Sequence, residues 1–77
     1  MPQAPEVDRV QREIGRRVRA ARLRAGMTQE AAAGEAGIDY KRWQRIETGE
    51  VNCTIRSLVR IAAALDTTFW RLLSARR

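Results

Sequence analysis

The sequence contains no histidine and a single cysteine, Cys53, among its 77 residues. One cysteine cannot close a disulfide within a chain, and the absence of histidine excludes a histidine-based metal site or catalytic triad. No glycine-rich phosphate-binding loop occurs, and no base lies in sequence near the cysteine. We therefore expect a protein that is not an enzyme and that uses no metal and no cofactor.

Long hydrophobic runs are also missing. No apolar stretch approaches the roughly 20 residues that span a bilayer, and the polar start, MPQAPEVD, lacks the apolar core of a signal peptide. We expect a cytoplasmic protein with no membrane partner. Both prolines lie in residues 1–5, which we predict to be a disordered N-terminal tail. Residues 6–77 are few enough to form one domain.

Positive charge is abundant. Fifteen Lys and Arg residues against nine Asp and Glu residues give a net charge of +6. Seven cations precede residue 39 and eight follow it, so the whole domain is basic and not only one tail. A basic domain favours a polyanionic partner. An arginine bias inherited from a GC-rich genome would explain the same charge.

Hydrophobic residues recur at the spacings of three and four that indicate amphipathic helices. No segment alternates with period two over the length of a strand. We predict an all-α fold with helices at about residues 6–25, 29–36, 40–47, 55–65 and 68–75. The predicted core stripes hold Val7, Val10, Ile14, Val18 and Ala21, then Ile55, Leu58, Ile61, Ala62 and Leu65, and finally Phe69, Leu72 and Leu73.

Residues 28–50, TQEAAAGEAGIDYKRWQRIETGE, divide at Gly37 into two short helices. Thr28 and Asp39 suit N-cap positions, because their side-chain oxygens accept from the first backbone N–H groups of a helix. Gly37 suits the position after a helix, where φ is often positive. Two short helices across a tight glycine-containing turn are typical of a helix-turn-helix.

The second of these helices has two unlike faces. On a helical wheel with Trp43 at zero, Ile46 and Glu47 fall within about 60° and form a docked side. The exposed side carries groups that can hydrogen-bond base edges in a major groove. A solvated basic face is the alternative interpretation. The exposed side chains are Tyr40, Lys41, Gln44 and Arg45.

The pattern resembles the phage repressor and Cro family of helix-turn-helix proteins, the Xre type. The resemblance rests on IGRRVRAARLRAGMTQE, on residues 28–50 and on TIRSLVRIAAAL, and it covers about residues 10–73. The segment IETGEVNCTI is also similar to restriction-modification controller proteins. The resemblance implies a compact five-helix domain with a central helix-turn-helix, a lambda-repressor-like DNA-binding fold. It further implies a homodimer that binds double-stranded DNA at a palindromic operator.

The resemblance also assigns roles by position. It gives base reading to Tyr40, Lys41, Gln44 and Arg45 and backbone contacts to Thr28, Gln29 and Thr48. Phosphate contacts are further expected from Arg42 and from Arg16 or Arg17. An ion pair is expected between Arg22 and Glu47, since both lie near the apolar stripe of their own helix and the family has a paired Arg and Glu there.

The sequence departs from the family pattern in three places: in the core of the helix-turn-helix, at Cys53 and at Trp70. Ala32 and Ala36 stand where leucine is usual and Trp43 where valine or isoleucine is usual, which we interpret as an exchange of volume. Stacking of an exposed Trp43 on bases is the alternative. Cys53 replaces a frequent proline and is expected to be inert, with redox sensing as the alternative.

Trp70 occupies a usually polar site on the last helix, off its core side. We expect it to contact a second copy of the chain, because tryptophan is enriched among the residues that dominate interfaces. An aromatic ring lying on its own domain is one alternative, and a dimer patch at Leu23 or at Val7 and Val10 is another. The expected function is a sequence-specific transcriptional regulator, a dimeric repressor or controller. The alternative is the antitoxin of a toxin–antitoxin pair, which would bind a toxin protein and its own operator.

Overall fold

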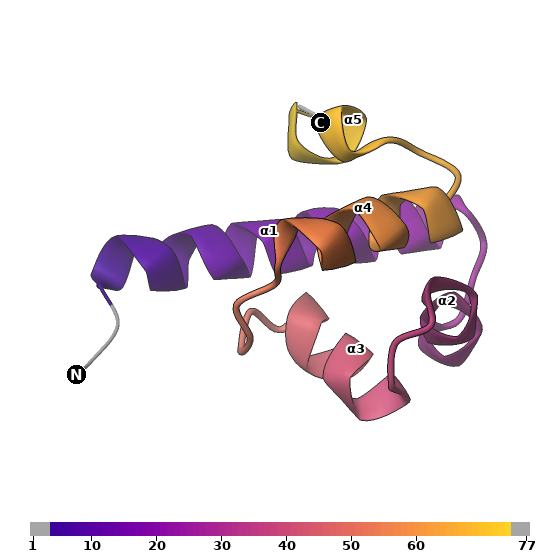
Figure 1. Cartoon of the computed structure of the whole chain (residues 1–77), viewed down its shortest axis with the longest axis horizontal. Helices are drawn as coiled ribbons and strands as arrows, with labels where there is room; N and C mark the ends of the chain where they lie inside the picture. The colour runs from indigo at the N-terminus through magenta and orange to yellow at the C-terminus, as the bar shows by residue number, and fades with distance from the viewer. Residues whose placement is uncertain (1–3, 75–77) are drawn as a thin grey trace.

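The computed structural model describes residues 4–74, which form five helices and no strand. The helices are α1 (Pro5–Arg24), α2 (Gln29–Ala36), α3 (Tyr40–Glu47), α4 (Ile55–Ala64) and α5 (Phe69–Ser74). This confirms the prediction of a compact all-α domain. Helix α3 packs on α1 and α2, α4 packs on α2, and α5 packs on α1 and α4. In Figure 1 the helix-turn-helix of α2 and α3 lies on the side opposite α5.

The helix ends follow local chemistry. Helix α1 begins at Pro5, one residue earlier than predicted, because the fixed φ and missing N–H of proline suit the first turn of a helix. Residue 5 is therefore not part of a disordered tail, and residues 1–3 of that tail lie outside the described residues. The other ends differ from the prediction by one residue at most. The predicted end of the last helix at residue 75 also lies outside them.

The turn between α2 and α3 is fixed by capping at both sides. Thr28 Oγ1 accepts from the Ala31 backbone N–H at 3.0 Å, which starts α2. Gly37 ends α2 in the left-handed region with φ 68°, where glycine has no Cβ penalty. The Asp39 carboxylate then accepts from the N–H groups of Lys41 and Arg42, at 3.1 and 3.3 Å, and starts α3.

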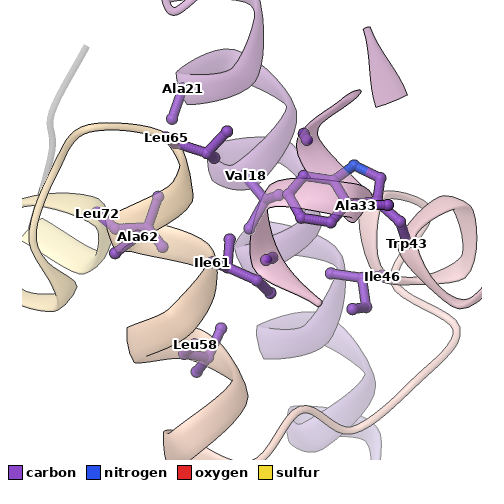
Figure 2. Packing of buried hydrophobic residues seen from close by; sticks show 12 residues of the cluster. Val18, Ala21, Ala33, Trp43, Ile46, Leu58, Ile61, Ala62, Leu65 and Leu72 are labelled. Atoms are coloured by element: carbon purple, nitrogen blue, oxygen red, sulfur yellow. The ribbon is translucent and has the colours of Figure 1, made fainter. Parts of the chain in front are cut away.

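The core is built around four large side chains that are fully buried, Val18, Trp43, Ile46 and Ile61. Figure 2 shows the indole of Trp43 beside Ala33, one of the small residues that α2 turns inward. The large ring thus lies against a helix with small inward side chains, in agreement with an exchange of volume. The alternative in which Trp43 stacks on bases is wrong, because none of its surface is exposed.

At Gly15, helix α1 lies directly against the last turn of α3. A Cβ atom added there would lie 2.5 Å from the carbonyl oxygens of Ile46 and Glu47, which no side chain tolerates. Only glycine therefore allows α3 to lie this close to α1. This close approach helps to fix the position of α3 on α1.

Two members of the predicted core stripes are exposed. Val10 is 48% exposed and Ile55 is 71% exposed, so their assignment to the core was wrong. The first turns of α1 project past the rest of the fold in Figure 1, and Ile55 precedes Leu58, the first residue of α4 that the core buries. Helical periodicity gives the direction of a side chain but not how far along the helix the core extends. None of the described helices has the length and apolar character needed to cross a membrane.

Candidate nucleic-acid interface

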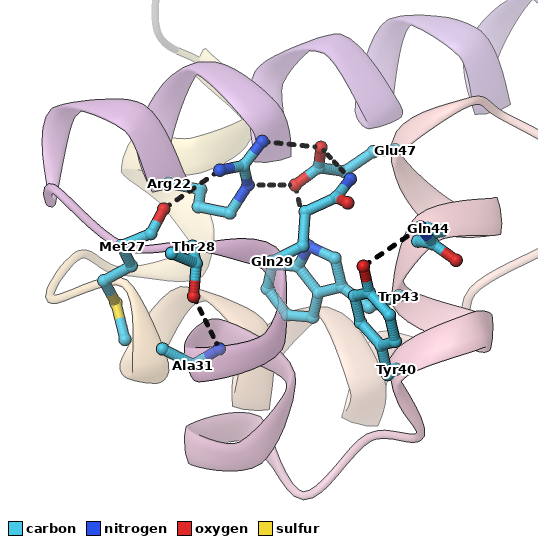
Figure 3. Close-up of polar contacts among 9 residues, drawn as sticks. All are labelled: Arg22, Met27, Thr28, Gln29, Ala31, Tyr40, Trp43, Gln44 and Glu47. Carbon is cyan, nitrogen blue, oxygen red and sulfur yellow. Dashed lines mark hydrogen bonds and ion pairs between the residues drawn. The ribbon is translucent and has the colours of Figure 1, made fainter.

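Helix α3 exposes one polar face, formed by Tyr40, Lys41, Gln44 and Arg45, which we call the reading face. All four side chains are exposed, whereas Trp43, Ile46 and Glu47 of the same helix are buried. Gln44 Nε2 donates to the Tyr40 hydroxyl at 3.3 Å, so these two residues support each other along the helix (Figure 3). The reading face therefore offers two cations, an amide and a phenol to a partner.

Glu50 lies at the end of the reading face, a contact that the sequence did not predict. Its Oε1 lies 3.7 Å from Arg45 Nε, and its Oε2 accepts from the Thr48 hydroxyl at 2.8 Å. The side chains of Arg45 and Glu50 are 60% and 59% exposed, and ion pairs this open to water are weak. Arg45 can therefore leave Glu50 for a stronger acceptor. An acid five residues after a candidate base reader is the sequence signal that could have revealed the contact.

The start of α2 flanks the reading face on one side. Thr28 and Gln29 stand at the N-terminus of this helix, where unpaired backbone N–H groups and the helix dipole favour an anion. Arg42 is exposed on the flank of α3 opposite to Gln44 by helical spacing. Groups suited to phosphate contacts therefore lie on both sides of the reading face.

Arg16 and Arg17 differ in their availability to a phosphate. Both bind Glu13, through Arg16 Nη2 at 2.6 Å and Arg17 Nε at 2.9 Å. Arg17 also donates from Nη1 to the carbonyl oxygen of Leu73 in α5, so it joins α1 to α5 on the side away from α3. The Arg16 side chain remains 67% exposed. Of the two, Arg16 is the one placed to meet a partner.

A buried polar network holds the reading helix from behind (Figure 3). Arg22 binds the Glu47 carboxylate with two nitrogens, Nε to Oε2 at 2.6 Å and Nη2 to Oε1 at 3.1 Å. Gln29 Nε2 donates to Oε1 at 3.0 Å, and Trp43 Nε1 donates to Oε2 at 2.7 Å. Arg22 also donates to the Met27 carbonyl at 2.9 Å. Helices α1, α2 and α3 therefore meet at one carboxylate.

The ionised state of Glu47 is set by two opposing effects. Burial on its own raises the pKa of Glu47. The hydrogen bonds from Arg22, Trp43 and Gln29, together with the charge of Arg22, outweigh burial and hold the pKa below its ordinary value. Glu47 is therefore an anion at neutral pH, and its charge is matched by Arg22.

Cys53 lies half-buried in the loop between α3 and α4. Burial raises the pKa of its thiol, and the positive charge of Arg42 offsets only part of that increase. The thiolate is the reactive form of cysteine, so a raised pKa lowers reactivity at neutral pH. These properties favour an inert cysteine over a redox sensor.

Trp70 is 75% exposed on α5, and its ring meets the ring of Phe69 edge-on at a centroid distance of 5.1 Å. Other large apolar side chains are exposed elsewhere. Leu23 is 54% exposed near the end of α1, and Ile55 and Val59 are 71% and 48% exposed on α4. The described surface thus carries exposed apolar side chains on α1, α4 and α5, and a partner could cover any of them.

Comparison with known proteins agrees with this geometry. The sequence model of a helix-turn-helix domain family matches residues 13–77. The restriction-modification controller protein C.AhdI from Aeromonas hydrophila superposes with a TM-score of 0.78 at 29% identity, covering 80% of this chain and 94% of that protein. ComR from Streptococcus suis superposes with a TM-score of 0.73 at 29% identity, covering 87% of this chain but 22% of ComR. No curated protein sequence matches significantly. The chain belongs to the helix-turn-helix family of the Xre type.

Proposed function

We propose that the chain is a sequence-specific transcriptional regulator that reads duplex DNA with α3. One observation carries this proposal: the reading face collects exposed hydrogen-bonding side chains on a helix whose other side is fixed by the core and by Glu47. A helix presented in this way fits the major groove of B-DNA, where each base pair displays a distinct pattern of donors and acceptors. A net charge of +6 adds attraction to the phosphate backbone.

Each residue of the reading face has a chemical role in this proposal. Lys41 and Arg45 donate to O6 and N7 of guanine, and Gln44 pairs with adenine. Tyr40 contacts a base or a phosphate. These contacts supply specificity, whereas phosphate contacts supply affinity and register. The backbone contacts are assigned to Thr28, Gln29, Arg42 and Thr48.

Gln29 can serve both the network and the DNA. One hydrogen of its Nε2 is used on Glu47, and an amide nitrogen carries two hydrogens. The second hydrogen and the carbonyl oxygen are left for a phosphate oxygen or for a neighbouring reading side chain. Gln29 therefore links a backbone contact to the position of α3.

The regulator is proposed to act as a homodimer on a palindromic operator. Two copies of α3 must then lie about one duplex turn apart, near 34 Å, with a self-complementary patch away from the groove. Trp70 is the proposed centre of that patch, since it is 75% exposed and lies on α5, opposite the helix-turn-helix in Figure 1. Leu23 and the first turns of α1 with Val7 and Val10 are competing patches, and the exposed Ile55 and Val59 of α4 add another.

Replacing Trp70 by alanine tests this interface. We expect Trp70→Ala to shift the monomer–dimer equilibrium toward monomer and to weaken operator binding without unfolding the domain. Sedimentation at micromolar concentration measures the dimer fraction, and Ile55→Ala is the matched change on the α4 patch. An unchanged dimer fraction in Trp70→Ala, with a loss in Ile55→Ala, would move the interface to α4. A parent chain that stays monomeric even on DNA would contradict the dimer.

The same fold would serve an antitoxin that binds a toxin protein and its own operator. The likeness to a restriction-modification controller protein over 94% of that protein's length supports a regulator as the primary function. A chain whose function needs a toxin would form a stable complex with the product of a neighbouring gene. Co-expression with that product and co-purification would favour the antitoxin.

Salt dependence tests DNA binding itself. Each phosphate neutralised by Arg or Lys releases condensed counterions and adds a slope of about −0.9 to the log–log plot of affinity against salt. We expect a slope corresponding to several contacts per subunit, measured by fluorescence anisotropy of a labelled duplex. Affinity that does not change with salt, or no binding at low salt, would contradict the proposal.

A further inference from the structure

The indole of Trp43 has a second feature besides its volume. Its Nε1 donates to Glu47 Oε2 at 2.7 Å, one helical turn along α3, and both side chains are buried. A valine or isoleucine, the usual residue type at this position in the resemblance, could fill a core but could not make this bond.

Trp43 completes the hydrogen bonding of the Glu47 carboxylate. A carboxylate has about four lone-pair positions, two on each oxygen. Arg22 occupies one on each oxygen, Gln29 takes the second on Oε1, and Trp43 takes the second on Oε2. Without the indole N–H, a buried acceptor position would be left unpaired, and such positions are costly.

The bond acts at the centre of the reading helix. Residue 43 lies between Tyr40 and Gln44, which are themselves linked by a hydrogen bond. Glu47 is held from α1 by Arg22 and from α2 by Gln29. Because Trp43 and Glu47 both belong to α3, their bond fixes the Glu47 side chain in the conformation that reaches these two partners. Gly15 sets the distance between α1 and α3, while the bonds of Glu47 to Arg22 and Gln29 restrict rotation of α3 about its own axis.

We propose that Trp43 is a positioning residue for DNA reading: its indole N–H holds the Glu47 side chain in place for the bonds to Arg22 and Gln29 that set the angle of the reading face. This inference rests on the proposed function, since it needs an operator to be read. Base contacts require a fixed angle because a bidentate hydrogen bond is lost by small rotations. Phosphate contacts from flexible cations tolerate the same rotation. The bond should therefore matter for specificity more than for general affinity.

Two replacements separate the hydrogen bond from packing. Trp43→Phe keeps an aromatic ring but loses the N–H, and replacement by β-(3-benzothienyl)alanine keeps the bicyclic shape with sulfur in place of N–H. The chain of 77 residues is short enough for chemical synthesis. Ile61→Val is the control, because it removes one methylene from a fully buried side chain of α4 without touching Glu47. Folding of each variant is checked by far-ultraviolet circular dichroism.

The measured quantity is the ratio of affinities for the operator and for a scrambled duplex at one salt concentration. We expect both replacements at Trp43 to lower this ratio about tenfold, the discrimination that one bidentate base contact supplies, with the scrambled duplex bound within about twofold of the parent. Ile61→Val should leave the ratio unchanged. Restoration of the ratio by the benzothienyl side chain would show that only packing matters, and an unchanged ratio in both would show that the bond does not position the helix. A parent with no preference for any duplex would instead overturn the proposed function.

Gln29 supplies an independent check. Because Gln29 and Trp43 bond different oxygens of one carboxylate, their effects on specificity should be coupled. Gln29→Ala should reduce the operator preference less in the Trp43→Phe background than in the parent. Equal losses in both backgrounds would contradict a common route through Glu47.

Discussion

Neutralising Glu47 should destabilise the domain far more than neutralising Glu50. Glu47→Gln keeps the size of the side chain but removes the charge that faces Arg22, and these two residues are only 8% and 7% exposed. In either orientation, the new amide NH₂ would face Arg22 and a second donor, which is Gln29 on one side and Trp43 on the other. Leaving one member of a buried ion pair without its partner costs about 3–5 kcal/mol. A domain of this size has a total stability of only ~4–12 kcal/mol at 0.05–0.15 kcal/mol per residue.

Urea unfolding followed by circular dichroism measures the difference. With a slope of roughly 1–3 kcal/mol per molar urea, Glu47→Gln should lower the midpoint by more than about 1 M. Glu50→Gln is the matched control, because its partner Arg45 lies 3.7 Å away and both side chains are largely exposed. Such exposed pairs contribute ~0–1 kcal/mol. Equal midpoints for the two variants would refute the buried network as the anchor of α3.

Three further outcomes follow from the same structure. Gly15→Ala should destabilise the domain, because its Cβ would lie 2.5 Å from backbone oxygens, whereas Gly34→Ala, with no atom within 4 Å, should leave thermal stability unchanged or raise it by ~0.5–1 kcal/mol. A similar effect of both would refute the close approach of α1 and α3. Lys41→Ala should cost about 1–3 kcal/mol on the operator and relax one base preference, whereas Arg42→Ala should weaken all duplexes evenly; binding assays on operator and scrambled DNA distinguish them. Folding lowers the pKa of Glu47, so its pairing contributes stability above the ordinary value of 4.5 that is lost as the pH falls through the lowered value. Urea titrations in acid should show this loss in the parent, and the same loss in Glu47→Gln would contradict it.

The sequence predicted the architecture because local signals were strong. The bounds of α2 and α3 match the prediction, since Thr28, Gly37 and Asp39 each have one obvious capping role. The direction of Trp43 also followed from helical spacing. Its hydrogen bond to Glu47 could have been read from the i, i+4 spacing of an indole and an acid on one helix face.

The sequence did not reveal where the packed core ends or which contacts form between separate parts of the chain. Val10 and Ile55 obey the apolar spacing of their helices, yet their side chains are 48% and 71% exposed. The contact of Glu50 with Arg45 depends on how the chain turns after α3, which composition does not determine. Arg17 likewise binds a carbonyl of α5, a contact across 56 residues of sequence that no local pattern encodes.

Selection of binding sites from random duplex DNA tests the central claim most directly. The parent should enrich a palindromic sequence whose half-sites lie about one helical turn apart, roughly 10 base pairs centre to centre. Selection with Arg45→Ala should enrich the same palindrome with one base pair per half-site relaxed, because Arg45 is assigned to a guanine in the major groove. An enriched sequence that is identical for the parent and for Arg45→Ala, or no enrichment by the parent, would contradict the assignment of α3 as the reading helix.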